Sequence, residues 1–170
     1  MSTAATEERY KALMLRAVAM RKHVGFNPAT WDNLGTKTAC MWAETVELEI
    51  ALVAGDQQEI AAELADIALY TLTSLGDLEE PWCLRSYMYK PGKFKSPGEL
   101  TAPARFAVRA VFESWRRGQR KDTIISLELL LLRCIDLAAT LDIDLEAAIS
   151  AKIEFNLTRP TRHGGKNPNT

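Results

Sequence analysis

Residues 37–75 have the sequence KTACMWAETVELEIALVAGDQQEIAAELADIALYTLTSL, in which two helical patterns flank one short turn. The first pattern ends at Gly55, a residue type that suits a helix C-terminus. Asp56 suits the N-cap of the next helix, with Glu59 three residues further on as in an acidic capping box. Two helices joined by so short a turn must run antiparallel and touch. The stretch therefore predicts an antiparallel helical hairpin.

Four carboxylates occupy matched positions on these two helices. Glu44 and Glu47 lie three residues apart on the first, and Glu63 and Asp66 lie three apart on the second, so each pair shares one helix face. Both pairs fall on or beside the apolar stripe that should face the core, whereas solvated acids normally lie opposite it. Converging carboxylates repel one another unless cations lie among them. We therefore predict a site for a hard divalent cation, although a surface run of charge explains either pair taken alone.

The remainder of the chain is also dominated by helical periodicity, and no alternating β-branched run predicts a strand. The expected fold is an all-α antiparallel bundle of about six helices, in a single domain of residues 1–160 followed by a flexible tail at 161–170. Asp142 or Asp144 is the expected cap of the last helix. The predicted helices span roughly residues 6–22, 37–54, 56–75, 104–117, 122–140 and 144–157.

A long loop insertion is predicted at residues 78–103, which contain four prolines and two glycines. Beyond it, residues 104–141 repeat the pattern of residues 37–78 when Gly118 is aligned with Gly55, but the acids do not repeat. A duplication that lost its acidic side chains explains this match, and so do two unrelated helical hairpins.

The composition is that of an ordinary globular protein, with 47% hydrophobic and 25% charged residues. The formal net charge of −1 gives no general attraction to nucleic acid or to an anionic membrane. The sequence shows no signal peptide and no apolar run long enough to span a bilayer. Cys40, Cys83 and Cys134 form no metal-binding or disulfide pattern. Together these features predict a cytoplasmic protein with buried free thiols.

A second apolar face lies on the first helix of the hairpin, behind the one that should meet the core. It is formed by Trp42, Val46, Ile50 and Val53. A helix that is apolar on two sides needs cover on both. We therefore expect a homodimer or homotetramer in which another copy of the chain covers this face.

The two acidic motifs resemble those of a known family. ExxE on one helix followed by ExxD on the next is similar to the all-α nucleoside triphosphate pyrophosphohydrolases, which include MazG and the dimeric dUTPases. The sequence ELADIALY at residues 63–70 resembles the third helix of that family, and residues 142–160 resemble the MazG-type terminal helix. The chain departs from the family at Ala43, where many members have a doubled glutamate, and at residues 78–121, which are absent from small MazG proteins.

The resemblance implies an activity and a cofactor. Members hydrolyse a nucleoside or deoxynucleoside triphosphate to the monophosphate and pyrophosphate, through attack of water on the α-phosphorus. Glu44, Glu47, Glu63 and Asp66 would be the catalytic ligands of Mg²⁺, with Mn²⁺ as a substitute, and one of them or a nearby acid would be the base.

Substrate contacts are expected from basic and amide side chains near the end of the chain, which share one helix face or extend beyond it. Trp31, Trp42 and Trp82 are further candidates for the wall of a base pocket, although core or interface packing explains them equally well. Ordinary solvated charge explains the tail residues equally well. The expected substrate-binding residues are Tyr70, Lys152, Asn156, Arg159, Arg162 and Lys166.

Three other classes compete with this hypothesis. A di-iron carboxylate bundle requires Glu-x-x-His pairs, and neither His23 nor His163 provides one. A non-catalytic helical module of the same fold would bind nucleotide or a protein partner. A structural helical dimer with surface acids would show no stabilisation by metal.

Overall fold

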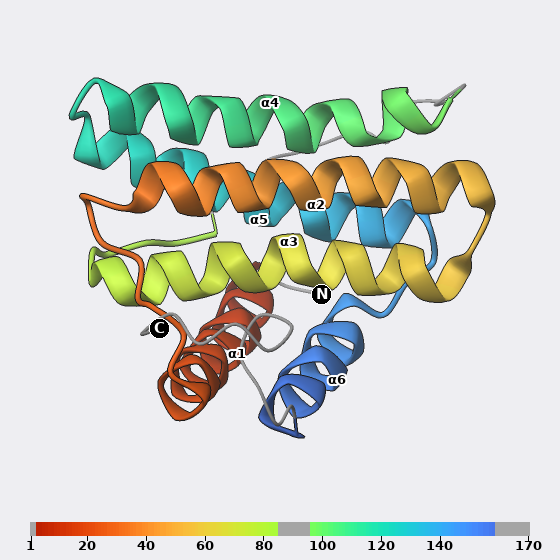
Figure 1. Cartoon of the computed structure of the whole chain (residues 1–170), viewed down its shortest axis with the longest axis horizontal. Helices are drawn as coiled ribbons and strands as arrows, with labels where there is room; N and C mark the ends of the chain where they lie inside the picture. The colour runs from red at the N-terminus through yellow and green to blue at the C-terminus, as the bar shows by residue number, and fades with distance from the viewer. Residues whose placement is uncertain (1–2, 85–95, 159–170) are drawn as a thin grey trace, which may run out of the picture.

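The computed structural model describes residues 3–84 and 96–158, and within these ranges the chain forms six α-helices and no strand. Figure 1 shows α2 to α5 as long helices lying side by side, with α1 and α6 steeply inclined to them beneath α3. The all-α prediction is confirmed. The helices are α1 (Thr3–Val24), α2 (Leu34–Ala54), α3 (Gln57–Leu78), α4 (Pro97–Arg116), α5 (Arg120–Thr140) and α6 (Leu145–Thr158).

The hairpin of α2 and α3 has the turn that the sequence predicts. Gly55 adopts the left-handed conformation, with φ 72°, and its N–H donates to the carbonyl oxygen of Ala51. The Asp56 side chain accepts hydrogen bonds from the N–H groups of Gln58 and Glu59, at 3.0 and 3.1 Å. The two helices are therefore joined antiparallel with both adjoining ends capped.

The second hairpin, α4 and α5, has a similar turn. Gly118 is left-handed with φ 69°, close to the value at Gly55. The helices of the two hairpins also have nearly equal lengths, from 20 to 22 residues. Tight αα-hairpins share this geometry whether or not they arose by duplication.

The predicted loop does not extend to residue 103, because α4 begins at Pro97. The Ser96 hydroxyl accepts a hydrogen bond from the N–H of Glu99 at 3.3 Å, and a proline at the first helical position has no N–H to satisfy. Pro103 consequently lies inside the helix. Residues 85–95 of the predicted loop and the tail predicted at 161–170 lie outside the described residues.

Other boundaries differ by a few residues. Helix α2 starts at Leu34 and includes Gly35, where a Cβ atom would lie 2.4 Å from the Trp115 ring. The glycine thus lets α4 approach α2 closely. Helix α5 starts at Arg120, two residues before its predicted start, so Asp122 lies in its first turn. Of the two expected caps for α6, Asp144 has this role and accepts from the N–H of Ala147.

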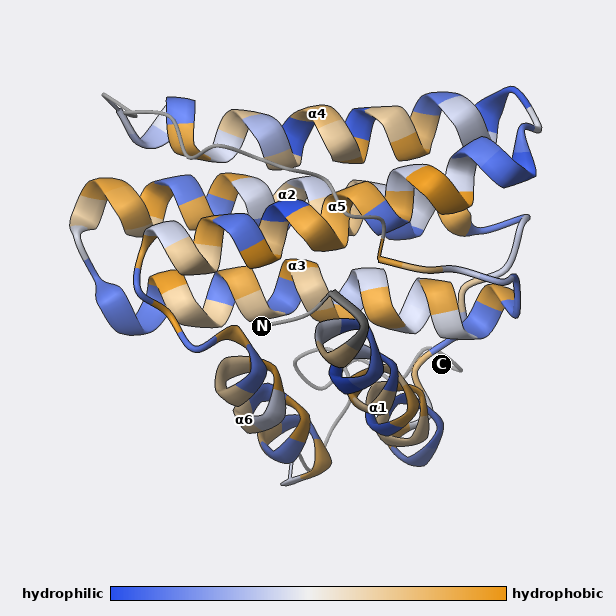
Figure 2. Ribbon diagram, turned by 180° about the vertical axis from the view of Figure 1, so that it is seen from behind, coloured by the Kyte–Doolittle hydropathy of each residue, from blue (hydrophilic) through white to orange (hydrophobic). Residues whose placement is uncertain are grey.

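The core is centred on α3, which contacts α1, α2, α5 and α6. Leu64, Ile67 and Leu72 of this helix are completely buried. Hydrophobic residues recur along α2, α3 and α5 (Figure 2), and buried residues from all six helices form one core. No helix in the described part of the chain combines the length and apolar character needed to cross a bilayer.

The second apolar face of α2 is exposed in the single chain. Its four residues, from Trp42 to Val53, have exposed fractions between 39% and 73%. The prediction that all three cysteines are buried is wrong for Cys83, which is exposed because it follows the end of α3. Cys134 is buried, Cys40 is half-buried, and all three thiols are free.

Candidate metal centre

Three of the four predicted acids converge at the middle of the α2–α3 hairpin. Glu44 of α2 and Glu63 and Asp66 of α3 each contribute an oxygen, and these oxygens lie within 4.8 Å of one another. The antiparallel register sets the middle of α2 against the first half of α3, and the apolar stripes turn both helices so that these acids face each other. All three side chains are half-buried.

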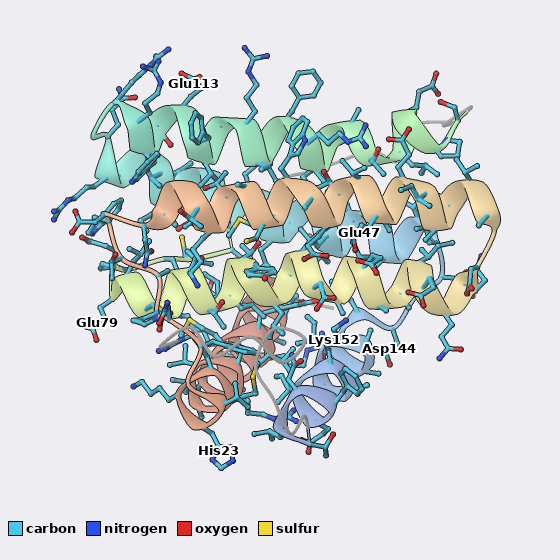
Figure 3. The ribbon with its side chains drawn as sticks, viewed as in Figure 1. His23, Glu47, Glu79, Glu113, Asp144 and Lys152 are labelled. Atoms are coloured by element: carbon cyan, nitrogen blue, oxygen red, sulfur yellow. The ribbon has the colours of Figure 1, made fainter. Side chains whose placement is uncertain are left out.

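The fourth acid, Glu47, lies at the margin of this cluster. Figure 3 shows it between α2 and α3, and its side chain is exposed. It lines the same cavity as the other acids and also an adjoining shallow hollow that includes Ile50. Glu49, on the other side of the helix, faces α4 and pairs with Arg105. Glu47 therefore lies beside the cluster, and its carboxylate is not one of the three that converge.

A cavity of about 510 Å³ extends from the acids to the end of α1 and to the connector that follows it. This volume suits a small organic molecule. Residues of α1, α2, α3 and α6 form its walls. Besides the four acids, the lining includes Met20, Arg21, Phe26, Asn27, Thr36, Lys37, Cys40, Leu69, Tyr70, Thr73, Lys152 and Asn156.

Burial and neighbouring carboxylates raise the pKa of two of these acids, Glu44 and Glu63. The pKa of Glu44 is raised to about 8, mainly by burial and then by the charge of Asp66 and a hydrogen bond with Glu63. Burial also raises the pKa of Glu63. The buried Oε2 atom of Glu63 has no hydrogen-bond partner among the described residues. Without a cation, the cluster is therefore partly protonated, and one of its buried oxygens lacks a hydrogen bond.

Two of the predicted substrate-binding residues reach this cavity from α6. The Lys152 ammonium forms an ion pair with the Asp66 carboxylate, and Figure 3 shows it between α6 and α3. Asn156 lies one turn further along and is buried, with 6% exposure. Their spacing of four residues puts both on the helix face that covers α3. Lys152 thus neutralises part of the acidic charge at the cluster.

Tyr70 also lines the cavity, as predicted, and burial raises the pKa of its hydroxyl. The three tryptophans proposed for a base pocket do not line it. Trp31 packs beneath Arg120, Trp42 is exposed on the outer face of α2, and Trp82 contacts Met14. Arg159, Arg162 and Lys166 lie outside the described residues.

Sequence reasoning missed the half of the cavity that α1 and the following connector provide. Arg21 is buried and pairs with Asp77 at 2.7 Å, and its other nitrogen donates to the Phe26 carbonyl at 3.0 Å. Asp77 also accepts from the N–H of Ala29 at 2.9 Å. This buried ion pair fastens the connector to α3. In the sequence, the only indication of this ion pair is that Arg21 and Asp77 each lie on a helix face that is otherwise apolar.

In comparisons with known proteins, no family model matches this chain, and neither does a curated protein or a solved structure.

Proposed function

We propose that this chain is a Mg²⁺-dependent nucleoside triphosphate pyrophosphohydrolase with a MazG-like fold. The observation that supports the proposal is the convergence of Glu44, Glu63 and Asp66 within 4.8 Å at one end of a cavity. An acidic cluster repels a triphosphate unless divalent ions lie between carboxylate and phosphate oxygens. A cavity that adjoins such a cluster suits a substrate of this kind.

The residues present fit a hard divalent cation. The three donors are carboxylate oxygens, which Mg²⁺ and Mn²⁺ prefer. A bound cation would coordinate the Oε2 atom of Glu63, which has no hydrogen-bond partner among the described residues. It would also displace the proton that Glu44 retains. Glu44, Glu63 and Asp66 would hold the ion, with Glu47 at the margin.

The reaction is hydrolysis at the α-phosphorus. When bound, the metal offsets phosphate charge and lowers the pKa of a bound water. Lys152 and Asn156 lie on the cavity wall opposite α2 and would donate hydrogen bonds to phosphate oxygens. Glu47, which lies outside the cluster and is exposed, would accept the proton of the attacking water.

Incubation with a panel of nucleoside triphosphates and Mg²⁺ tests the activity. We expect release of pyrophosphate and monophosphate from at least one of them, because the proposed reaction is attack of water on the α-phosphorus. Pyrophosphate and orthophosphate should be assayed separately. Orthophosphate as the only product, or no turnover of any triphosphate, would contradict the proposal. Binding of nucleotide without turnover would favour a non-catalytic module.

We also propose that the chain assembles as a homodimer or homotetramer through the outer face of α2. This face exposes Trp42, Val46, Ile50 and Val53, and Phe106 of the neighbouring α4 is 69% exposed. Contiguous exposed apolar side chains of this kind mark protein contacts.

Substitution of Ile50 by lysine should therefore shift the assembly to monomers, because a charge would be buried at the contact. Sedimentation equilibrium measures the mass of each species. Leu15→Lys is the matched control, since Leu15 of α1 is 66% exposed, like Ile50 at 63%, but lies on another part of the surface. A monomeric wild-type protein would exclude this assembly.

A further inference from the structure

The end of the cavity remote from the acids contains a half-buried ammonium group. Lys37 Nζ donates a hydrogen bond to the main-chain oxygen of Asn27 at 2.8 Å. No carboxylate forms an ion pair with it in the part of the chain that the structure describes. Burial lowers the pKa of Lys37, while the more distant charges of Asp77 and Arg21 act in opposite directions. An ammonium has three donors, so this one can still donate to a ligand.

The position of Lys37 follows from the helical register. Lys37, Cys40 and Glu44 lie three and four residues apart, so they share the face of α2 that lines the cavity. Seven residues of helix separate Lys37 from Glu44, which corresponds to about 10 Å along the axis. This length is of the order of the span from the α-phosphorus of a nucleotide to the far edge of its base.

The surroundings of Lys37 suit a neutral, planar group. Phe26 and Tyr70 provide aromatic walls, and Asn27 and Thr73 provide neutral polar groups. Arg21, the other cation at this end, is already neutralised by Asp77 at 2.7 Å. Under the proposed function the phosphates bind through the cation at the acidic end, which leaves the Lys37 end of the cavity for the base.

We propose that Lys37 recognises a carbonyl oxygen on the far edge of the base, an inference that rests on the proposed function. The preferred substrates then have a 4-oxo pyrimidine or a 6-oxo purine. A carbonyl oxygen accepts a charge-assisted hydrogen bond from the ammonium. An amino group at the same position sets a donor against a donor and leaves the ammonium without an acceptor.

Binding of unphosphorylated nucleosides in the presence of a chelator tests this assignment. Nucleosides carry no phosphate, so their binding requires neither metal nor turnover. Uridine against cytidine and inosine against adenosine are pairs that differ in oxo or amino substitution at the far edge. By isothermal titration calorimetry we expect the oxo member of each pair to bind at least about tenfold more tightly.

Lys37→Met should remove this preference, because the side chain keeps its length and loses its donor. Lys121→Met is the matched control, since Lys121 is exposed on α5 and does not line the cavity, and it should retain the preference. Equal affinities within each pair, a preference that persists in Lys37→Met, or no binding of any nucleoside would overturn the assignment. If Lys37→Met fails to fold, the wild-type comparison can still overturn the assignment, because equal affinities contradict it. If the wild-type protein releases no pyrophosphate from any triphosphate but still prefers the oxo nucleosides, only the proposed function is overturned.

Discussion

Glu63→Gln should lower the rate of pyrophosphate release on the order of a thousandfold, while the protein remains folded. Glu63 contributes one of the three clustered oxygens, and an amide in its place removes one of the three negative charges that a divalent cation would meet. The variant should also lose the rise in melting temperature that Mg²⁺ gives the wild-type protein. Without metal it should melt at the same or a higher temperature, because one repelling carboxylate is gone.

The control for this substitution is Glu8→Gln, which changes an exposed carboxylate on α1 that lies outside the cavity. It should retain wild-type turnover and wild-type stabilisation by Mg²⁺. Turnover of Glu63→Gln within tenfold of wild type would show that the cluster does not bind the catalytic cation. A large loss of metal-free stability would show that the carboxylate has a structural role.

The hairpin and its acids could be predicted from sequence because their signals are local. Gly55 and Asp56 adjoin and have strong conformational preferences, and the turn they form fixes the antiparallel register. The spacing of Glu63 and Asp66 places both on one face whatever surrounds the helix. Convergence with Glu44 then follows from the turn alone, without knowledge of the other helices.

The second half of the cavity could not be predicted in the same way. Arg21 and Asp77 are 56 residues apart, and only the packing of α1 against α3 brings them together. Lys37 is an ordinary lysine at the start of a helix until the connector covers it. Such positions depend on tertiary contacts that leave no periodic pattern.

At the start of α4 the predicted loop is wrong, although the local sequence favours the beginning of a helix. Proline and glycine at residues 97 and 98 suggested a loop, but a proline directly after a serine cap is favourable in the first turn. Thr101 is completely buried and donates to Glu49 of α2 at 3.3 Å, so tertiary contact also supports the helix here. The cap explains the beginning of the helix, and the contact holds its first turns against α2.

The metal-free protein should lose stability as the pH rises from about 4.5 to about 8, and Mg²⁺ should bind more tightly over the same range. The pKa of Glu44 is about 8 in the folded state, against 4.5 for an ordinary glutamate side chain. Below the lower value the group is protonated in both states. Between the two values the unfolded chain ionises first, so the folded state loses stability until its own pKa is passed.

The expected loss is about 2 kcal/mol, because solvent screening of a half-buried group reduces the full linkage value. Cation binding should release protons, since the ligands must ionise, and it should remove most of the pH dependence. Chemical denaturation across this pH range, with chelator or with Mg²⁺, measures both effects. Glu44→Gln should flatten the metal-free profile, because the amide does not titrate. A wild-type profile that is already flat would mean that the three carboxylates are not held together in solution, and both the cation site and the hydrolysis that depends on it would have to be abandoned.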